Sequence, residues 1–148
     1  EDMNKLNLQW DLPDLKPGLS RTIQKTIGES DNLAYGHGAL TELLPTPPLT
    51  ALMIEAAIQV VDPLLPQGYV TVATSFSVTY LSPTFLGATI TVVATLVGVE
   101  GKGLVFDLMA FDELGQVGRG RHERYIVNSE HFMDTARKRC EPIRKIIK

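Results

Sequence analysis

The sequence lacks several features that would assign it to a common class. It has a single cysteine among 148 residues, which excludes an intrachain disulfide and a metal site built from several cysteines. No apolar run approaches the roughly 18 residues needed to cross a bilayer, and the first residues lack the basic-then-apolar order of a signal peptide. We therefore expect a soluble, cytoplasmic protein that does not interact with membranes.

Positive charge is scarce outside the C-terminal end. Residues 130–148 carry six Lys or Arg against three Asp or Glu, so residues 1–129 carry a net charge of −6 within a total of −3. Nucleic-acid binding usually needs a broad basic surface, so this balance predicts no nucleic-acid partner. The basic end itself is typical of a solvated amphipathic helix.

Motifs of three enzyme classes are also absent. His122-Glu123 lacks the second histidine of a zinc-protease helix. The glycines Gly115, Gly118 and Gly120 precede no helix and are not a dinucleotide fingerprint. No nucleophile-elbow motif of a serine hydrolase is present. We expect no metal and no cofactor, apart from coenzyme A as part of a substrate or ligand.

The length and composition fit one compact domain. Hydrophobic residues make up 44% of the chain and charged residues 21%, and no repeat or linker divides it. We divide the chain into an irregular, proline-containing N-terminal segment, residues 1–17, and a single domain, residues 18–148.

A buried helix is predicted from residue 46 onward. Thr46 is a natural N-cap and Pro47 a natural first helical residue. Apolar residues then recur at the i, i+3, i+4, i+7 spacing of a buried face: Leu49, Leu52, Met53, Ala56, Ala57, Val60 and Val61. Ile54 and Ile58 widen this face, so the helix should be buried on more than one side.

The other segments have the two-residue alternation of β-strands. Strands are expected over 19–27 before the helix, and over 69–81, 87–99, 104–111 and 117–127 after it. In the second strand the alternation places Val70, Val72, Phe76, Val78 and Tyr80 on one face. A last helix is predicted over 130–139, with Pro142 interrupting it before 143–148.

One strand, one helix that is apolar on several sides, and four antiparallel strands is the element order of an α+β hotdog fold. In this fold a five-stranded antiparallel sheet wraps around one central helix, and here a short C-terminal helix follows. Another α+β sandwich with the same order is the alternative. An open sheet has exposed edges that two subunits commonly close, so we expect a homodimer.

Three segments resemble the fluoroacetyl-CoA thioesterase-like family of hotdog proteins, over residues 18–138. Gly36-His37-Gly38-Ala39-Leu40 and residues 44–57 resemble its loop and helix. Residues 80–87, Tyr-Leu-Ser-Pro-Thr-Phe-Leu-Gly, resemble its His-Leu-Ala-Ala-Thr-Pro-Val-Gly turn, and residues 118–124 resemble its Gly-x-Gly-x-His-Glu-Arg strand. The resemblance implies hydrolysis of an acyl-CoA thioester at a dimer interface by a Thr, a Glu and a His.

The family's catalytic Thr falls on Thr46, but its Glu falls on Ile54 and its His on Tyr80. At a helix N-terminus the Thr46 hydroxyl can hydrogen-bond the thioester, and the amides of Leu49 and Thr50 would supply the positive field. An ordinary capping role would also explain this threonine. Tyr80 is a candidate catalytic residue, yet a tyrosine with a pKa near 10 is a poor base at neutral pH, and closing the core edge explains it equally well.

Neighbouring residues offer partial substitutes for the missing groups. Glu55 lies about 100° around the helix from the family's Glu position and should point toward Gln59 instead. His37 is a candidate relocated catalytic histidine, because it lies in the loop that forms a lid over the acyl pocket in the family, together with Leu40 and Leu43.

We expect the following residues to contact a small acyl thioester: Leu40, Leu43, Leu49, Thr50, Ile54, Ala73 and Arg124. Ala73 stands where family members tend to have a glycine close to the thioester. Alternation puts Arg119 and Arg121 on the opposite strand face from Arg124. We therefore place the phosphates of coenzyme A near Arg124 and the basic cluster 137–139.

Three function classes stay open, because fold similarity alone does not separate them. The first is an acyl-CoA thioesterase with a rearranged catalytic set. The second is an acyl-CoA-binding protein without hydrolysis, since Ile54 and Tyr80 replace both ionisable catalytic positions. The third is a hotdog enzyme of another reaction, such as a dehydratase, which needs an acid–base pair that the sequence does not show.

Overall fold

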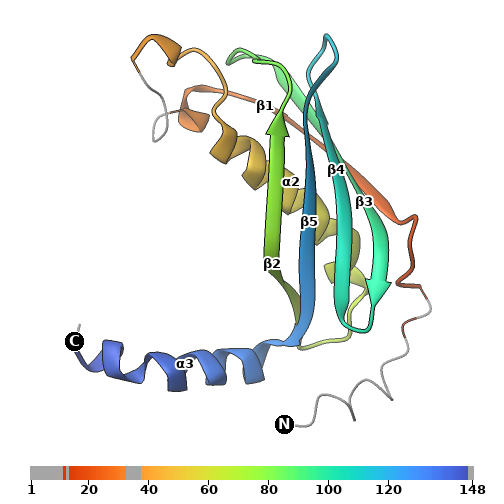
Figure 1. The fold of residues 1–148 in the computed structure, drawn as a ribbon, viewed down its shortest axis with the longest axis vertical. Helices are drawn as coiled ribbons and strands as arrows, with labels where there is room; N and C mark the ends of the chain where they lie inside the picture. The colour runs from red at the N-terminus through yellow and green to blue at the C-terminus, as the bar shows by residue number, and fades with distance from the viewer. Residues whose placement is uncertain (1–11, 13, 33–37, 147–148) are drawn as a thin grey trace.

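The computed structural model describes residues 12, 14–32 and 38–146. One antiparallel sheet has the strand order β1-β3-β4-β5-β2, and a helix lies against one of its faces (Figure 1). The elements are β1 (Ser20–Thr26), α2 (Thr46–Val61), β2 (Tyr69–Tyr80), β3 (Thr89–Glu100), β4 (Gly103–Phe111), β5 (Gln116–Asn128) and α3 (Ser129–Ile146). Short 3-10 turns are η1 (Glu29–Asp31), η2 (Gly38–Leu40) and η3 (Asp62–Leu64). This is the hotdog arrangement that the element order predicts.

The apolar face of α2 is buried as its spacing predicts. The buried residues of the helix are Leu49, Leu52, Met53, Ala56, Ala57, Val60 and Val61, the set expected from the sequence. Ile54 and Ile58 are half-buried on one flank. The helix ends at Val61, where the turn η3 follows. Burial of this face against the sheet forms the main core of the domain.

Two glycines of β5 allow α2 to lie close to the sheet. The Cδ2 atom of Leu49 lies 3.2 Å from the position that a Cβ atom on Gly118 would occupy. A Cβ atom on Gly120 would lie 2.9 Å from the carbonyl oxygen of Ser77 and 3.5 Å from the sulfur of Met53. Glycine is therefore required at position 120, because the nearest obstacle is backbone that has no rotamer to change.

Strand β2 contains a bulge that the alternation of its sequence does not predict. Its pairing with β5 shifts between Ala73 and Ser75, which leaves Thr74 as an extra residue. Before the bulge Thr71 is buried and Val70 is 39% exposed, whereas the even-numbered side chains face the core after it. The predicted common face is therefore wrong for the first half of the strand, because one inserted residue exchanges the two faces.

Helix α3 is continuous through Pro142, contrary to the predicted interruption. Proline removes one helical hydrogen bond, the one that would reach the carbonyl of Lys138. Lys138 and its neighbours are exposed, so water can satisfy that carbonyl and the helix persists to Ile146. Figure 1 shows α3 leaving the end of β5 and projecting past the edge strand β2.

The tight packing of β5 against β2 can be tested at Gly120. We expect Gly120→Ala to lower the free energy of unfolding by about 1–3 kcal/mol, because the added methyl group meets the Ser77 carbonyl. The measurement is urea unfolding followed by circular dichroism.

Gly28→Ala is the matched control for this substitution. Its Cβ atom would meet nothing within 4 Å, and its φ of −127° suits any residue. Its effect should stay within about 1 kcal/mol. Equal losses in the two variants would contradict the packing argument.

Candidate functional site

Helix α2 begins one residue earlier than the sequence predicts. Pro45 has an extended backbone, with φ −76° and ψ 163°, and is the N-cap, so Thr46 is the first helical residue. The prediction of Thr46 as the N-cap is wrong. A capping threonine there would bond to the N–H groups two or three residues further on, and Pro48 has none.

The first turn of α2 has few free backbone donors. A helix leaves the N–H groups of its N-cap and first three residues without helical partners. Pro45, Pro47 and Pro48 occupy three of these four positions and carry no N–H. The N–H of Thr46 is the one that remains. The partial positive charge at the N-terminus of this helix is therefore presented by a single N–H group.

Leu49 and Thr50 do not supply the donors predicted for them. Their N–H groups lie far enough into the helix to bond to carbonyls one turn earlier. The Leu49 side chain is fully buried against Gly118 and has no surface to offer a substrate. Thr50 is half-buried.

The Thr46 side chain is half-buried at this end of α2. Within the part of the chain that the structure describes, no hydrogen bond involves its hydroxyl. The hydroxyl and the N–H of the same residue are thus two donors at the positive end of a helix. Such donors stabilise negative charge that develops on a carbonyl oxygen.

The segment 42–44, which leads into α2, pairs with the connection between β2 and β3. The N–H of Leu44 donates to the carbonyl of Thr84 at 2.9 Å, and the N–H of Leu86 donates to the carbonyl of Glu42 at 2.8 Å. These backbone bonds fix the direction in which the chain enters the helix.

Two side chains hold the same segment through its carbonyl oxygens. Asn32 Nδ2 donates to the carbonyl of Leu43 at 2.6 Å. The Tyr80 hydroxyl donates to the carbonyl of Leu44 at 2.8 Å. Because Leu44 is two residues before Thr46, these bonds hold the threonine in place as well.

The Tyr80 hydroxyl keeps its proton at neutral pH. Burial raises the pKa of Tyr80 to about 12, and the negative charge of Asp112 adds to this effect. A protonated hydroxyl that already donates to the Leu44 carbonyl does not accept a proton from water. The structure gives Tyr80 a positioning role, and its direct catalytic role stays a prediction.

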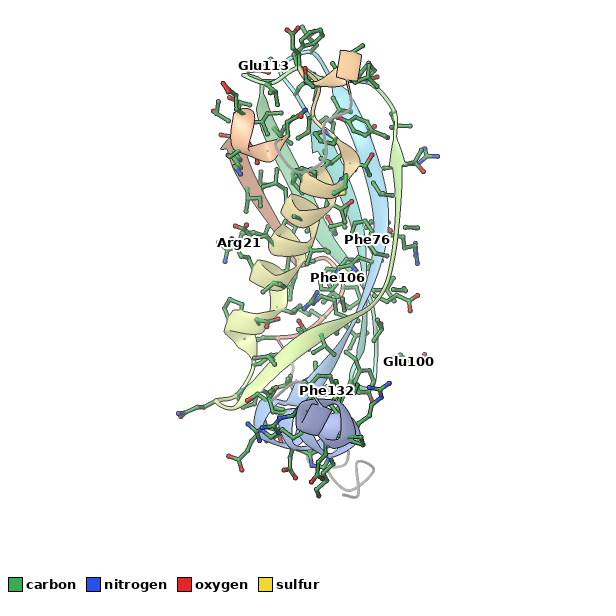
Figure 2. All side chains as sticks on the ribbon, turned by 90° about the vertical axis from the view of Figure 1, so that its left-hand side faces the viewer. Arg21, Phe76, Glu100, Phe106, Glu113 and Phe132 are labelled. Carbon is green, nitrogen blue, oxygen red and sulfur yellow. The ribbon has the colours of Figure 1, made fainter. Side chains whose placement is uncertain are left out.

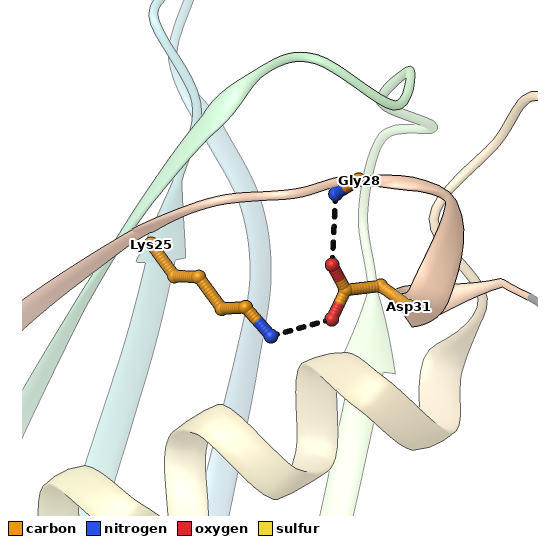
Figure 3. A network of polar contacts seen from close by, with 3 residues as sticks. All are labelled: Lys25, Gly28 and Asp31. Atoms are coloured by element: carbon orange, nitrogen blue, oxygen red, sulfur yellow. Dashed lines mark hydrogen bonds and ion pairs between the residues drawn. The ribbon is translucent and has the colours of Figure 1, made fainter.

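Asp31 fixes the turn that precedes Asn32 (Figure 3). Asp31 accepts hydrogen bonds from Lys25 Nζ at 2.6 Å and from the N–H of Gly28 at 2.8 Å. Burial alone would raise the pKa of Asp31, but these bonds and the charge of Lys25 hold it below its ordinary value. No sequence pattern predicts the role of Asn32, because a single asparagine beside a loop is common.

No carboxylate takes the family's Glu position beside Thr46. Ile54 occupies it and is half-buried. Glu55 is exposed and accepts a hydrogen bond from Gln59 Nε2 at 3.2 Å, which confirms the direction predicted from helical spacing.

The predicted lid residues are described only in part. His37 lies outside the described residues. Leu40 is 57% exposed in η2. Leu43 is half-buried and forms an isolated bridge with Phe85, which is 62% exposed. The described part of the lid therefore presents apolar side chains beside the start of α2.

Arg124 is buried in the core instead of facing a phosphate. It is 5% exposed, and its Nε and Nη2 atoms donate to the hydroxyl and the carbonyl of Thr71, both at 2.7 Å. The Thr71 hydroxyl in turn donates to Asp62 at 2.6 Å, at the end of α2. The prediction of Arg124 as a ligand contact is wrong, because alternation separates the two strand faces without showing which one the helix covers.

His122 completes this buried network. Its Nδ1 donates to the carbonyl of Ser75 at 2.8 Å, and its Nε2 accepts from Arg124 Nη1 at 3.1 Å. This pattern assigns the neutral ring with the proton on Nδ1. Burial lowers the pKa of His122, and the charge of Arg124 lowers it further. The network therefore fixes the bulge of β2, where the predicted substrate contact Ala73 lies exposed.

The other basic residues lie away from Thr46. Arg119 and Arg121 line a hollow of about 380 Å³ on the sheet face opposite α2, where Arg121 pairs with Asp107 at 3.1 Å. This separation from Arg124 confirms the predicted alternation of β5.

The cluster 137–139 lies at the far end of the molecule. The N–H of Ser129, which starts α3, donates to the carbonyl of Gly68 before β2, while Tyr80 at the other end of β2 holds Leu44. The whole length of β2 separates the cluster from Thr46, so within one chain it does not meet a ligand bound there.

Two other features are absent from the residues that the structure describes. None of the described helices is long and apolar enough to span a membrane. No group of three or more described His, Cys, Asp or Glu side chains is placed to hold a metal ion.

Two comparisons of the sequence with known proteins give matches. The model of a family described as fluoroacetyl-CoA-specific thioesterase matches residues 27–130. A fluoroacetyl-CoA thioesterase from Streptantibioticus cattleyicolor is 31% identical over 112 residues, which cover 76% of this chain and 78% of that protein.

Solved structures give the same result. A hot-dog-like protein from Thermanaerovibrio acidaminovorans has a TM-score of 0.80 at 29% identity and covers 94% of this chain and 97% of its own. A variant of a fluoroacetyl-CoA-specific thioesterase, solved with fluoroacetate and CoA, has a TM-score of 0.73 at 27% identity and covers 80% of this chain and 99% of its own.

The buried neutral state of His122 predicts a pH-dependent stability. An unfolded histidine gains a proton near pH 6.5, whereas the folded pKa is lowered, so the unfolded state binds more protons at acidic pH. The free energy of unfolding should fall as the pH drops below about 6.5, by up to about 1.4 kcal/mol per pH unit. Urea unfolding at a series of pH values from about 7.5 to about 5 measures this change. The pKa of Asp31 is held below its ordinary value, so this carboxylate does not contribute in that range.

Two variants test whether His122 causes this dependence of stability on pH. His122→Gln should be less stable at neutral pH but show a flatter slope, because it has no ring to protonate. His131→Gln, at an exposed histidine of α3, should keep the slope of the native protein. A slope that survives in His122→Gln would contradict the assignment.

Proposed function

This chain belongs to the fluoroacetyl-CoA-specific thioesterase family, and we propose that it takes a small acyl-CoA thioester at a cleft beside Thr46, at the interface of a homodimer. The observation that carries the proposal is the start of α2. There the Thr46 hydroxyl has no hydrogen-bond partner among the described residues, while the chain in front of it is bonded on both sides.

The chemistry expected of Thr46 is stabilisation of the thioester oxygen. As the carbonyl carbon is attacked, negative charge develops on its oxygen, which the hydroxyl and N–H of Thr46 can receive as hydrogen-bond donors. The helix dipole favours the same charge at this end. The bonds from Asn32 and Tyr80 keep these donors in a fixed position, so little reorganisation is needed during reaction.

Hydrolysis also needs a nucleophile or a base, and here the chain departs from its family. Ile54 has no ionisable group, and the pKa of Tyr80 is raised to about 12. We therefore propose slow hydrolysis at most. The second candidate function is binding of an acyl-CoA without turnover, which the same two residues favour.

The proposed dimer forms along β2. This strand is at one edge of the sheet and exposes unpaired backbone groups, which a second copy can cover. Ile54 and Ile58 form the half-buried flank of α2 that the sheet of one chain leaves accessible. Antiparallel pairing of two β2 strands would bury this flank and the edge together.

Substitution of Thr46 tests the proposed site. We expect the native protein to turn over small acyl-CoA thioesters well below the typical enzyme range of roughly 1–1,000 per second. Thr46→Ala should lower any residual rate about tenfold or more, and Thr46→Ser, which keeps the hydroxyl, should retain it. Thiol release measures turnover, and calorimetry with the same thioesters measures binding.

The two measurements separate the candidate functions. Tight binding without thiol release selects the binding protein. Brisk turnover that Thr46→Ala leaves unchanged would remove Thr46 from the reaction and make His37 the first residue to substitute.

Restoring the family's ionisable pair tests the missing chemistry. Ile54→Glu combined with Tyr80→His should raise turnover more than either change alone, because a nucleophile and its base act as a unit. The control is Ile58→Glu with Tyr80→His, which places the carboxylate one turn further from Thr46 at a similarly half-buried position. Thermal unfolding checks that each variant is folded, because burying a carboxylate is destabilising. An equal gain in the control would show that the position of the carboxylate does not matter.

A further inference from the structure

Helix α3 carries an apolar stripe that the described chain does not cover. The stripe consists of Phe132, Met133, Ala136, Cys140 and Ile143, which lie within about 100° of one another around the helix. Phe132, Met133 and Ile143 are 45%, 49% and 51% exposed. The helix is nevertheless well formed, since Asn128 caps its start through a 2.9 Å bond to the N–H of His131. A capped helix with an exposed apolar stripe lacks a partner.

Arginines flank the stripe on both sides. Helical spacing places Arg137 and Arg144 along one border and Arg139 along the other, all exposed. The opposite face is mixed and includes the ion pair between Asp134 and Lys138 at 3.4 Å. The surface that fits this helix is therefore apolar and bordered by acidic groups.

The opposite end of the same molecule has an apolar surface with acidic residues around it. We call residues 28–32, 38–45, 81–88 and 112–116 the lid end. Its exposed apolar side chains are Leu40, Leu81, Phe85 and Leu114, at 57%, 43%, 62% and 96%. Its exposed charged residues are acidic: Glu29, Glu42 and Glu113, with Asp112 half-buried, whereas Asp31 is buried and paired with Lys25 of β1. Figure 2 shows Glu113 at this end and Phe132 at the other.

Within one chain the two surfaces do not meet, but pairing along β2 brings them together. Antiparallel pairing of two β2 strands places the Tyr69 end of one strand beside the Tyr80 end of the other. Helix α3 starts at the Tyr69 end and projects past the β2 edge, toward the place of the second copy (Figures 1 and 2). The lid end of the second copy then lies where this α3 points.

We propose that the apolar stripe of α3 docks on the lid end of a second copy of this chain, with its arginines against the acidic border, and so packs over the lid beside that copy's Thr46. The proposal rests on the β2-paired dimer of the proposed function. By symmetry each subunit receives the helix of the other, so the contact occurs twice in the dimer. Each site would then be covered by a helix of the partner chain.

Photo-crosslinking tests this contact directly. Chains labelled with ¹⁵N and carrying Phe132→p-benzoylphenylalanine are mixed with unlabelled native chains to form mixed dimers. Mass spectrometry should find crosslinks of mixed isotope composition to partner peptides of the lid end. The same probe at Asp134, on the opposite face of α3, should give several-fold fewer.

Sedimentation measures the contribution of the contact to assembly. Phe132→Ser with Ile143→Ser should raise the dimer dissociation constant about tenfold or more, because two large apolar side chains lose their buried site. The matched control is Asp134→Ser with Lys138→Ser, which removes both members of an exposed ion pair and should change the constant less than about twofold.

The outcomes separate this proposal from the proposed function. A native dimer with Thr46-dependent turnover but no crosslinks between chains, or with crosslinks away from the lid end, overturns the α3 contact alone. A native monomer overturns both the dimer and the contact. Binding of α3 to vesicles containing anionic lipid, lost in Phe132→Ser with Ile143→Ser and without crosslinks between chains, would identify a membrane surface as the partner instead.

Discussion

The contact between α2 and β5 is the one on which the other features depend. Gly118 and Gly120 leave room for Leu49 and Met53, so the helix lies close against the sheet. Its position in turn places Thr46 at one end of the sheet and Asp62 at the other. Each end is then fixed by polar bonds, because polar groups beside a core are stable only when they are paired.

The strand motif of residues 118–124 has a structural role in this chain. Its inward-facing members are two glycines that admit the helix, followed by His122 and Arg124, which fill the space where the helix ends. These two side chains bond to carbonyls and hydroxyls of β2 on both sides of its bulge. The same residues that signal the family therefore also determine how α2 packs on the sheet.

Much of the fold could be predicted, because it depends on local periodicity. The buried face of α2 and the five strands follow from spacing alone. The bulge in β2 could not be predicted, since residues 73–75, Ala-Thr-Ser, contain no glycine or other bulge signal and the inserted residue appears only in the pairing with β5. The burial of Arg124 could not be predicted for a related reason, because a strand pattern does not show which face the helix will cover.

The site was predictable only where the family motif is kept. Thr46 lies where the motif places it, whereas the bonds of Asn32 and Tyr80 to the chain before it depend on segments that meet only after folding. At Tyr80 the side chain that replaces a histidine is used as a hydrogen-bond donor to the backbone. Where the family has a histidine that can accept a proton, this chain therefore has a tyrosine whose hydrogen bond holds the backbone before Thr46.

The run Pro45-Thr46-Pro47-Pro48 has a consequence for the unfolded chain. Each proline fixes its own φ angle and restricts the residue before it, so this segment has few conformations available before folding begins. Ordering it removes less conformational entropy than ordering the same length of ordinary chain. The bonds from Asn32 and Tyr80 therefore have fewer alternative conformations to select against when they hold the chain in front of Thr46.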